Sequence, residues 1–215
     1  PVLYHSFAGL QVPITVLHAR VGTSPSAGSL LPRLAPGRNI EVLDRFLQEW
    51  ERYAAEVLEI HLSFPLLSYY RSQHDNQSWL AAMTMMLDAC ALTIAGLKDV
   101  DPYQPQLTFA MARHTVVDLC QVFQARPIEL ETDRLPPDRL ARLLDEIELS
   151  GLELRERTIL EAKLVELRQM YEPFVNALSS YLVLTLPPVY HESTTVDNWQ
   201  TSAWMKRTSG IGKLA

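Results

Sequence analysis

The sequence predicts an all-α protein, a helical bundle built around one buried central helix. Residues 76–96 are apolar on almost every side, and Asp88 is the one charged side chain among them. A helix that is hydrophobic all round is either buried among other helices or spans a membrane. Asp75 or Asn76 can cap its start and Gly96 its end. We expect a core helix, because a membrane span would place Asp88 near mid-bilayer at a cost of about 2.5–3.5 kcal/mol.

The N-terminal residues predict an arm rather than part of the bundle. In residues 2–21, β-branched and aromatic side chains alternate loosely, which favours an extended or strand-like arm, although the frayed end of a helix fits as well. Residues 22–38 are dense in Gly, Pro and Ser, which is typical of a linker. We therefore divide the chain into a coupling arm and linker (1–38), a helical bundle (39–188) and a C-terminal tail (189–215).

The bundle begins with an amphipathic helix over residues 39–62. Apolar side chains recur on one face at helical spacing, and acidic side chains fill the other face. Glu56, Glu59 and His61 stand at the end of the acidic face, where we expect solvation rather than metal binding. After Pro65 the sequence predicts a second, short helix that ends near Tyr70.

Prolines and glycines predict where the later helices begin and end. A short turn at 99–102 makes a helix over 105–124 the antiparallel neighbour of the central helix. A loop bracketed by prolines precedes a helix over 138–149. The last helix is expected from Leu152 to the proline pair at 187–188.

The end of the chain has two features that we expect to matter for shape. Pro173 lies inside the last predicted helix and should kink it, because proline donates no backbone hydrogen bond and its ring displaces a carbonyl. The tail contains Trp199 and Trp204, and a tryptophan pair this close in sequence usually packs back onto the protein.

Composition limits the classes of function. The net charge is −6, with 47% hydrophobic and 20% charged residues, so the chain can form a core but lacks the basic excess expected of a nucleic-acid-binding protein. Nucleotide-binding glycine motifs and the HExxH and GxSxG motifs are absent from the sequence. Cys90 and Cys120 lie in apolar helical patterns, so we expect buried thiols in a reducing compartment, with no disulfide, no structural metal and no cofactor.

Asp88 defines the first candidate polar or ligand site. In an antiparallel hairpin whose turn lies near residue 100, position 88 lies opposite Arg113, with His114 as the neighbouring alternative. A structural ion pair is the default interpretation of this carboxylate, and a ligand-binding or catalytic role is the more specific alternative. His114 and Asp118 are four residues apart, which suits two metal ligands, but a local hydrogen bond is the commoner outcome. We assign none of these side chains a catalytic role.

A second candidate site is the polar turn before the central helix, with Arg71, His74, Asp75 and Gln77. Free backbone N–H groups gather at a helix N-terminus, so this turn could hold a small anion. A hydrogen-bonded connection between two helices explains the same residues.

Three segments resemble a known family. The opening residues 1–4 together with 17–28 (LHARVGTSPSAG) are similar to the segment after the inner pore helix of bacterial potassium-channel-like membrane proteins, which have a two-transmembrane pore. Residues 63–80, including YRSQHDNQSWL, resemble the cytosolic domain of that family. Residues 197–204 (DNWQTSAW) resemble its C-terminal signature.

The resemblance implies a cytosolic regulatory or assembly domain at the inner face of the bacterial inner membrane, and not an enzyme. The chain has no TVGYG-type filter, so its partner would be its own pore module, and potassium ions would pass through that module alone. A domain joined to a pore inherits the pore's symmetry, so we expect a homo-oligomer. Deletion of residues 1–38 is expected to leave the bundle folded. The alternative is a free-standing helical enzyme or small-molecule-binding protein that uses Asp88, Arg113 and His114.

Overall fold

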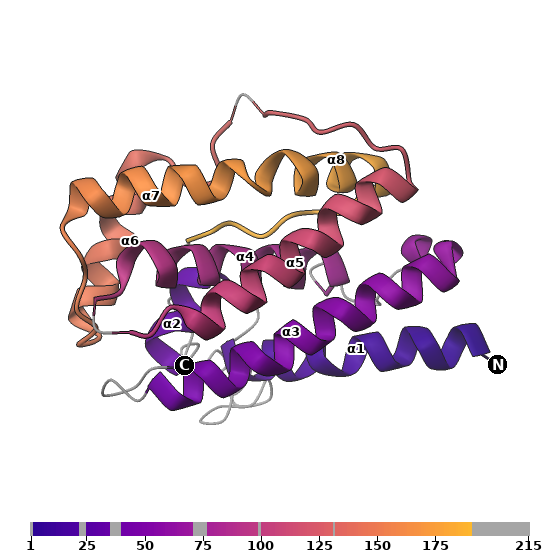
Figure 1. The fold of residues 1–215 in the computed structure, drawn as a ribbon, viewed down its shortest axis with the longest axis horizontal. Coiled ribbons are helices and arrows are strands. Elements are labelled where there is room, and N and C mark those ends of the chain that lie inside the picture. The colour runs from indigo at the N-terminus through magenta and orange to yellow at the C-terminus, as the bar shows by residue number, and fades with distance from the viewer. Residues whose placement is uncertain are drawn as a thin grey trace, which may run out of the picture.

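The computed structural model describes residues 2–21, 25–34, 40–70, 77–98, 100–130 and 132–190. The helices within these residues are α1 (Val2–Val21), α2 (Ala27–Leu34), α3 (Ile40–Ser63), η2 (Pro65–Tyr69), α4 (Trp79–Gly96), α5 (Tyr103–Val122), α6 (Pro137–Leu149), α7 (Arg157–Gln169) and α8 (Glu172–Leu182). Figure 1 shows α7 and α8 along one edge of the bundle, α1 and α3 along the opposite edge, and α4 and α5 between them. No strand occurs in the described residues, so the predicted all-α helical bundle is confirmed.

Helix α4 is the centre of this bundle, as the sequence predicts. All of its residues are buried, and it packs against α1, α2, α3, α5, α7 and α8. It begins at Trp79, and its cap is Ser78, whose hydroxyl accepts a hydrogen bond from the Ala81 backbone N–H at 3.0 Å. Among the described residues, α4 alone is long and apolar enough to cross a membrane, but the protein itself surrounds it on every side.

The strand-like arm predicted for residues 2–21 is wrong, because these residues form helix α1. Leu10, Ile14 and Leu17 recur at helical spacing and are almost fully buried, whereas Val12 and Val16 are exposed. The apparent alternation through these five positions therefore separates two faces of a helix. Burial against neighbouring helices decides the conformation here, since β-branched residues are only mildly unfavourable in a helix.

The linker predicted over 22–38 contains the short helix α2, which is part of the core. Leu30 and Leu31 are fully buried, and Gly28 is closely packed, because an added Cβ would lie 2.7 Å from the Leu143 side chain and 3.0 Å from that of Tyr190, so that a neighbour would have to shift. The Gly28 backbone N–H donates to the Val189 carbonyl at 3.1 Å. Residues far apart in the sequence therefore meet at α2. The tryptophans of the predicted tail, Trp199 and Trp204, lie outside the described residues.

Helices α3 and α5 form the most extensive helix pair and run parallel to one another. The hydroxyl of Thr108 donates to the Leu47 carbonyl, and that of Thr115 donates to the Ala54 carbonyl, each at 2.9 Å and each between buried groups. From the first bond to the second, the donor moves two turns toward the C-terminus of α5 and the acceptor moves two turns toward the C-terminus of α3. The two helices therefore run in the same direction. These bonds satisfy hydroxyl groups that would otherwise be buried without a partner.

The single last helix predicted from Leu152 is two helices. Helix α7 ends at Gln169, and α8 starts at Glu172, with Pro173 in its first turn rather than in a kinked helix interior. A proline is favoured in a first turn, where its missing N–H would have no helical partner. The break leaves Tyr171 between the two helices, where it is fully buried.

His61 corrects another prediction, because it is fully buried rather than solvated, while Glu56 and Glu59 are exposed as expected. Its ring lies 4.7 Å from the Trp79 ring, and its Nδ1 donates to the Val57 carbonyl at 2.7 Å. Within the described residues its Nε2 has no hydrogen-bond partner. Burial lowers the pKa of His61, although the bond to Val57 partly opposes this.

This buried histidine predicts a loss of stability on mild acidification. Below pH 6.5 the unfolded chain binds a proton at position 61 that the folded protein does not, so the free energy of unfolding falls by at most about 1.4 kcal/mol per pH unit. The loss extends down to the lowered pKa of folded His61. Urea midpoints at pH 7.5 and 5.5 measure it. We expect His61→Phe to flatten this dependence, whereas His114→Gln, on the surface, retains it; equal pH dependence in His61→Phe and the parent protein would contradict the assignment.

Candidate functional site

Asp88 is the charged group at the centre of the bundle, and its surroundings define the candidate site. Its side chain is 1% exposed. The guanidinium of Arg134 forms a fork with it, with Nη1 3.2 Å from Oδ1 and Nη2 2.5 Å from Oδ2. The hydroxyl of Tyr171 donates to Oδ1 at 2.6 Å. A two-bonded arginine and a tyrosine together satisfy a carboxylate that has no access to water.

Arg134 connects three parts of the chain that are distant in sequence. It lies in the loop between α5 and α6 and bonds to Asp88 on α4, to Glu172 on α8 and to the Pro187 carbonyl. The Pro187 carbonyl accepts from Nε at 3.2 Å and from Nη2 at 2.8 Å. Because an arginine has five N–H donors and five such contacts are present, Arg134 is fully engaged.

A second arginine extends the arrangement toward the surface. Arg168 on α7 donates to Glu172 at 3.0 Å from Nε and 2.9 Å from Nη2, and Nη2 also donates to Asp133. Asp133 in turn accepts the backbone N–H of Leu135 at 2.8 Å, which fixes the loop that carries Arg134. We call these six residues the charged network: Asp88, Asp133, Arg134, Arg168, Tyr171 and Glu172.

The electrostatics of the charged network keep its hydrogen-bond donors protonated. Burial, and then the charge of Asp88, raise the pKa of Tyr171 well above its usual value. Burial lowers the pKa of Arg134, but the adjacent carboxylates outweigh this and the net shift is upward. Burial raises the pKa of Glu172, and Arg168 opposes that rise. Tyr171 is therefore a neutral donor and not a nucleophile, and the arginines hold the carboxylates in place.

A pocket of about 360 Å³ opens beside the charged network, between α7, α8 and the loop before α6. Asp133, Glu172 and Glu129 contribute carboxylates to its wall, and the described part of the chain offers no partner to the buried Oδ1 of Asn176, which also lines it. Arg134 has no remaining donor, but Arg168 also lines the pocket, and its bonds to Glu172 and Asp133 use only Nε and Nη2. The pocket therefore offers both donors and acceptors, which suits a small polar molecule.

The sequence-predicted partners of Asp88 are wrong, although its burial is confirmed. Arg113 instead donates from Nε to the Met170 carbonyl at 3.2 Å. His114 Nε2 lies 3.3 Å from Asp118 Oδ2 near the surface, which is the local contact preferred for that pair. Within the described residues neither Arg113 nor His114 bonds to Asp88. The Asp88–Arg113–His114 site is therefore not assembled, because α4 turns Asp88 toward Tyr171 and Arg134.

The second predicted site falls largely outside the described residues, which do not include Arg71, His74 and Asp75. Gln77 is described, is half-buried and immediately precedes the cap residue Ser78. The anion-binding and interhelix interpretations of that turn both stay predictions.

Arg134, Arg168 and Tyr171 are not among the site residues predicted from the sequence. The sequence does contain one indication that the loop carrying Arg134 is buried. Arg134 lies directly before Leu135 in the proline-bracketed loop, and Leu135 is 2% exposed. An apolar residue in such a loop indicates that the loop packs onto the core, and a neighbouring charge must then find a partner.

The cysteines offer no reactive group. Cys90 and Cys120 are free and buried. Burial raises the pKa of both thiols, that of Cys120 to about 12, and Cys120 Sγ donates to the Phe174 carbonyl at 3.3 Å. In the part of the chain that the structure describes, no three His, Cys, Asp or Glu side chains gather where they could hold a metal ion.

Comparison of the chain with protein-family models, curated proteins and solved structures finds no match. The described fold is a single-core helical bundle whose central charge is locked by a loop arginine.

Proposed function

We propose that this chain is the cytosolic regulatory and assembly domain of a bacterial potassium-channel-like membrane protein, located at the cytoplasmic face of the inner membrane. The three resembling segments support this proposal: residues 1–4 with 17–28, residues 63–80, and residues 197–204. The domain does not conduct ions itself. Its partner is a pore module, through which potassium ions pass.

The observation that carries the proposal is the way in which α1 is attached. The buried hydroxyl of Tyr53 on α3 donates to the Leu10 carbonyl at 3.1 Å, and the Arg20 guanidinium lies 5.4 Å from the centre of the Phe46 ring. With Leu10 and Ile14 buried as well, α1 is held to α3 at several points along its length. A helix held in this way transmits a rearrangement of the bundle to whatever it joins, which is what a regulatory arm requires.

The outer face of α1 supports the assembly role. Val12 is 62% exposed and Val16 43% exposed, and both line an open groove between α1 and α3 together with Pro13. An apolar strip of this kind suits contact with a second copy of the domain, and copies arranged around a pore form a closed ring. The number of subunits follows that of the pore.

Channel recording on the full-length protein tests the regulatory role. Tyr53→Phe removes the bond that fastens α1 to α3, so the open probability should change while the single-channel conductance stays the same. Tyr69→Phe is the matched control, because the Tyr69 hydroxyl donates at the surface to Tyr181, at 3.1 Å. An open probability identical in the parent protein and both variants, with unchanged assembly, would refute a regulatory role for α1.

The alternative of a helical enzyme loses its specific site, because Asp88, Arg113 and His114 do not converge. The groups that do converge, Asp88, Arg134 and Tyr171, are satisfied by one another. Their arrangement supports a structural role, in which these three side chains hold α4 and its neighbours together. A regulatory domain needs such a rigid bundle for α1 to pack against.

A further inference from the structure

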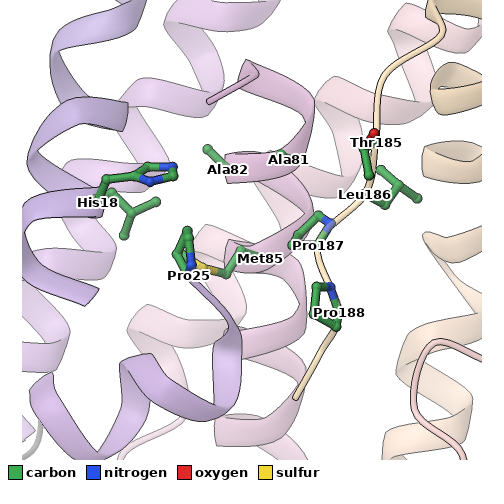
Figure 2. Close-up of a pocket in the computed structure, with 10 residues that line it drawn as sticks. His18, Pro25, Ala81, Ala82, Met85, Thr185, Leu186, Pro187 and Pro188 are labelled. Atoms are coloured by element: carbon green, nitrogen blue, oxygen red, sulfur yellow. The ribbon is translucent and has the colours of Figure 1, made fainter. Parts of the chain in front are cut away.

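An apolar cavity of about 180 Å³ lies between α1, α4 and the extended residues 185–188. Figure 2 shows His18 on one side of it, Ala82 and Met85 on α4, and Thr185 and Pro187 on the far side. Most of the surface that lines the cavity is hydrocarbon, and the His18 ring and the Thr185 hydroxyl are its polar side chains. The charged network lies outside this lining apart from the contact through Pro187.

Small side chains and proline create this space. Ala81 and Ala82 leave room on α4 where larger residues would close the gap, while Met85 stands one turn further along the helix. Pro187 and Pro188 form the opposite wall, and consecutive prolines keep a segment extended rather than letting it collapse as a helix. The cavity therefore follows from the residue types on its two sides.

The wall opposite α1 is held in place by the charged network. The Pro187 carbonyl accepts two hydrogen bonds from Arg134, which is forked to Asp88. Ala81, Met85 and Asp88 share one face of α4, since they are four and then three residues apart. The network thus fixes both α4 and residues 185–188, so the cavity exists before any ligand arrives.

The volume indicates the size of the occupant. A buried cavity of about 150 Å³ lined by apolar side chains stays dry and binds benzene. Drug-sized ligands need pockets of about 300–1,000 Å³. The cavity here is therefore suited to one aromatic ring system or a short hydrocarbon chain, with room for a polar group near His18 or Thr185.

We propose that this cavity binds a small apolar molecule of the size of benzene or indole, and that its occupancy strengthens the docking of α1 on α4. The ligand would touch Leu17 and His18 on α1 as well as Ala82 and Met85 on α4, so it favours the arrangement in which these helices are in contact. Binding is independent of the channel proposal. The regulatory meaning of the binding, a pore that responds to a small apolar molecule, rests on the proposed function.

Titration of the full chain with benzene and with indole tests the binding. In protein with 13C-labelled methionine methyl groups, we expect the Met85 methyl resonance to shift saturably with a Kd of about 1 mM or below. Ala82→Leu fills part of the cavity and should weaken binding at least tenfold. Ala110→Leu, the same change on the exposed face of α5, should leave it unchanged.

A second variant guards against misfolding of Ala82→Leu. Thr185 is exposed at the cavity mouth, so Thr185→Trp should obstruct entry while the protein stays folded. Absence of a saturable shift with both probes would overturn the binding proposal. Equal affinity in the parent protein, Ala82→Leu and Thr185→Trp would overturn the location.

Amide hydrogen exchange tests the coupling to α1. At saturating indole, exchange in the second half of α1, which contains Leu17 and His18, should slow relative to the ligand-free protein. Unchanged exchange there would overturn the coupling. None of these measurements needs a pore, so their failure is distinct from a failure of the Tyr53→Phe recordings, which need no ligand.

Discussion

Replacing Arg134 by methionine is expected to lower the free energy of unfolding by about 3–5 kcal/mol, because it leaves the carboxylate of Asp88 buried without a cation. The methionine retains much of the aliphatic stem, so the loss reports the charge and its hydrogen bonds. The Tyr171 hydroxyl still donates to Asp88, but one neutral hydrogen bond does not replace a forked ion pair. Urea denaturation with linear extrapolation measures the difference.

Arg113→Met is the matched control for Arg134→Met. Arg113 is half-buried and donates to the Met170 carbonyl, so its loss should cost about 1 kcal/mol. In the double variant Asp88→Asn with Arg134→Met, the buried charge is gone as well, so the cost should be smaller than the sum of the two single changes. If Arg113→Met destabilised the protein more than Arg134→Met, the partner inferred from helix register would be the correct one.

The comparison of Arg113 with Arg134 explains what the sequence could and could not predict about the site. Burial of Asp88 followed from its position in an apolar helix, and that prediction is confirmed. The identity of the cation that pairs with Asp88 could not be predicted in the same way. The rotation of α4 about its own axis decides which side Asp88 faces, and packing against several helices sets that rotation. Arg134 lies in a loop, where no periodic pattern indicates a direction.

The helices differ in the same way: some are predicted by their local sequence pattern, and others are decided by contacts with distant parts of the chain. Helix α3 and the central helix α4 have strong local patterns and were predicted correctly. Helix α1 has β-branched residues and Pro13, and its apolar positions suit a strand or a helix equally well. Contact with α3 and α4 selects the helix. The sequence of α2 has linker composition, but its leucines find a buried site that only the complete bundle provides.

Because α1 and α2 are part of the core, the expected effect of truncation changes. Deletion of residues 1–38 is now expected to abolish cooperative folding of the remaining chain, instead of leaving the bundle intact. The deleted segment contains these buried aliphatic side chains: Leu10, Ile14, Leu17, Val21, Leu30, Leu31 and Leu34. Full burial of one such side chain is worth about 1.5–3 kcal/mol, whereas a whole domain is stable by about 5–15 kcal/mol. Differential scanning calorimetry should show no sharp transition for the truncated chain.

Two single substitutions in α1 measure how much its buried face contributes, because both replace a β-branched residue by alanine, which favours a helix, and they differ in burial. Ile14→Ala opens a cavity at a fully buried position and should cost about 2–5 kcal/mol. Val12→Ala changes a β-branched residue that is 62% exposed, so the effect should stay within about 0.5 kcal/mol. A truncated chain that melts as sharply and at the same temperature as the full chain, with Ile14→Ala as mild as Val12→Ala, would mean that α1 is a separate arm. The channel proposal would then require a flexible connection, because a helix that does not share the core cannot carry a rearrangement of the core to a pore.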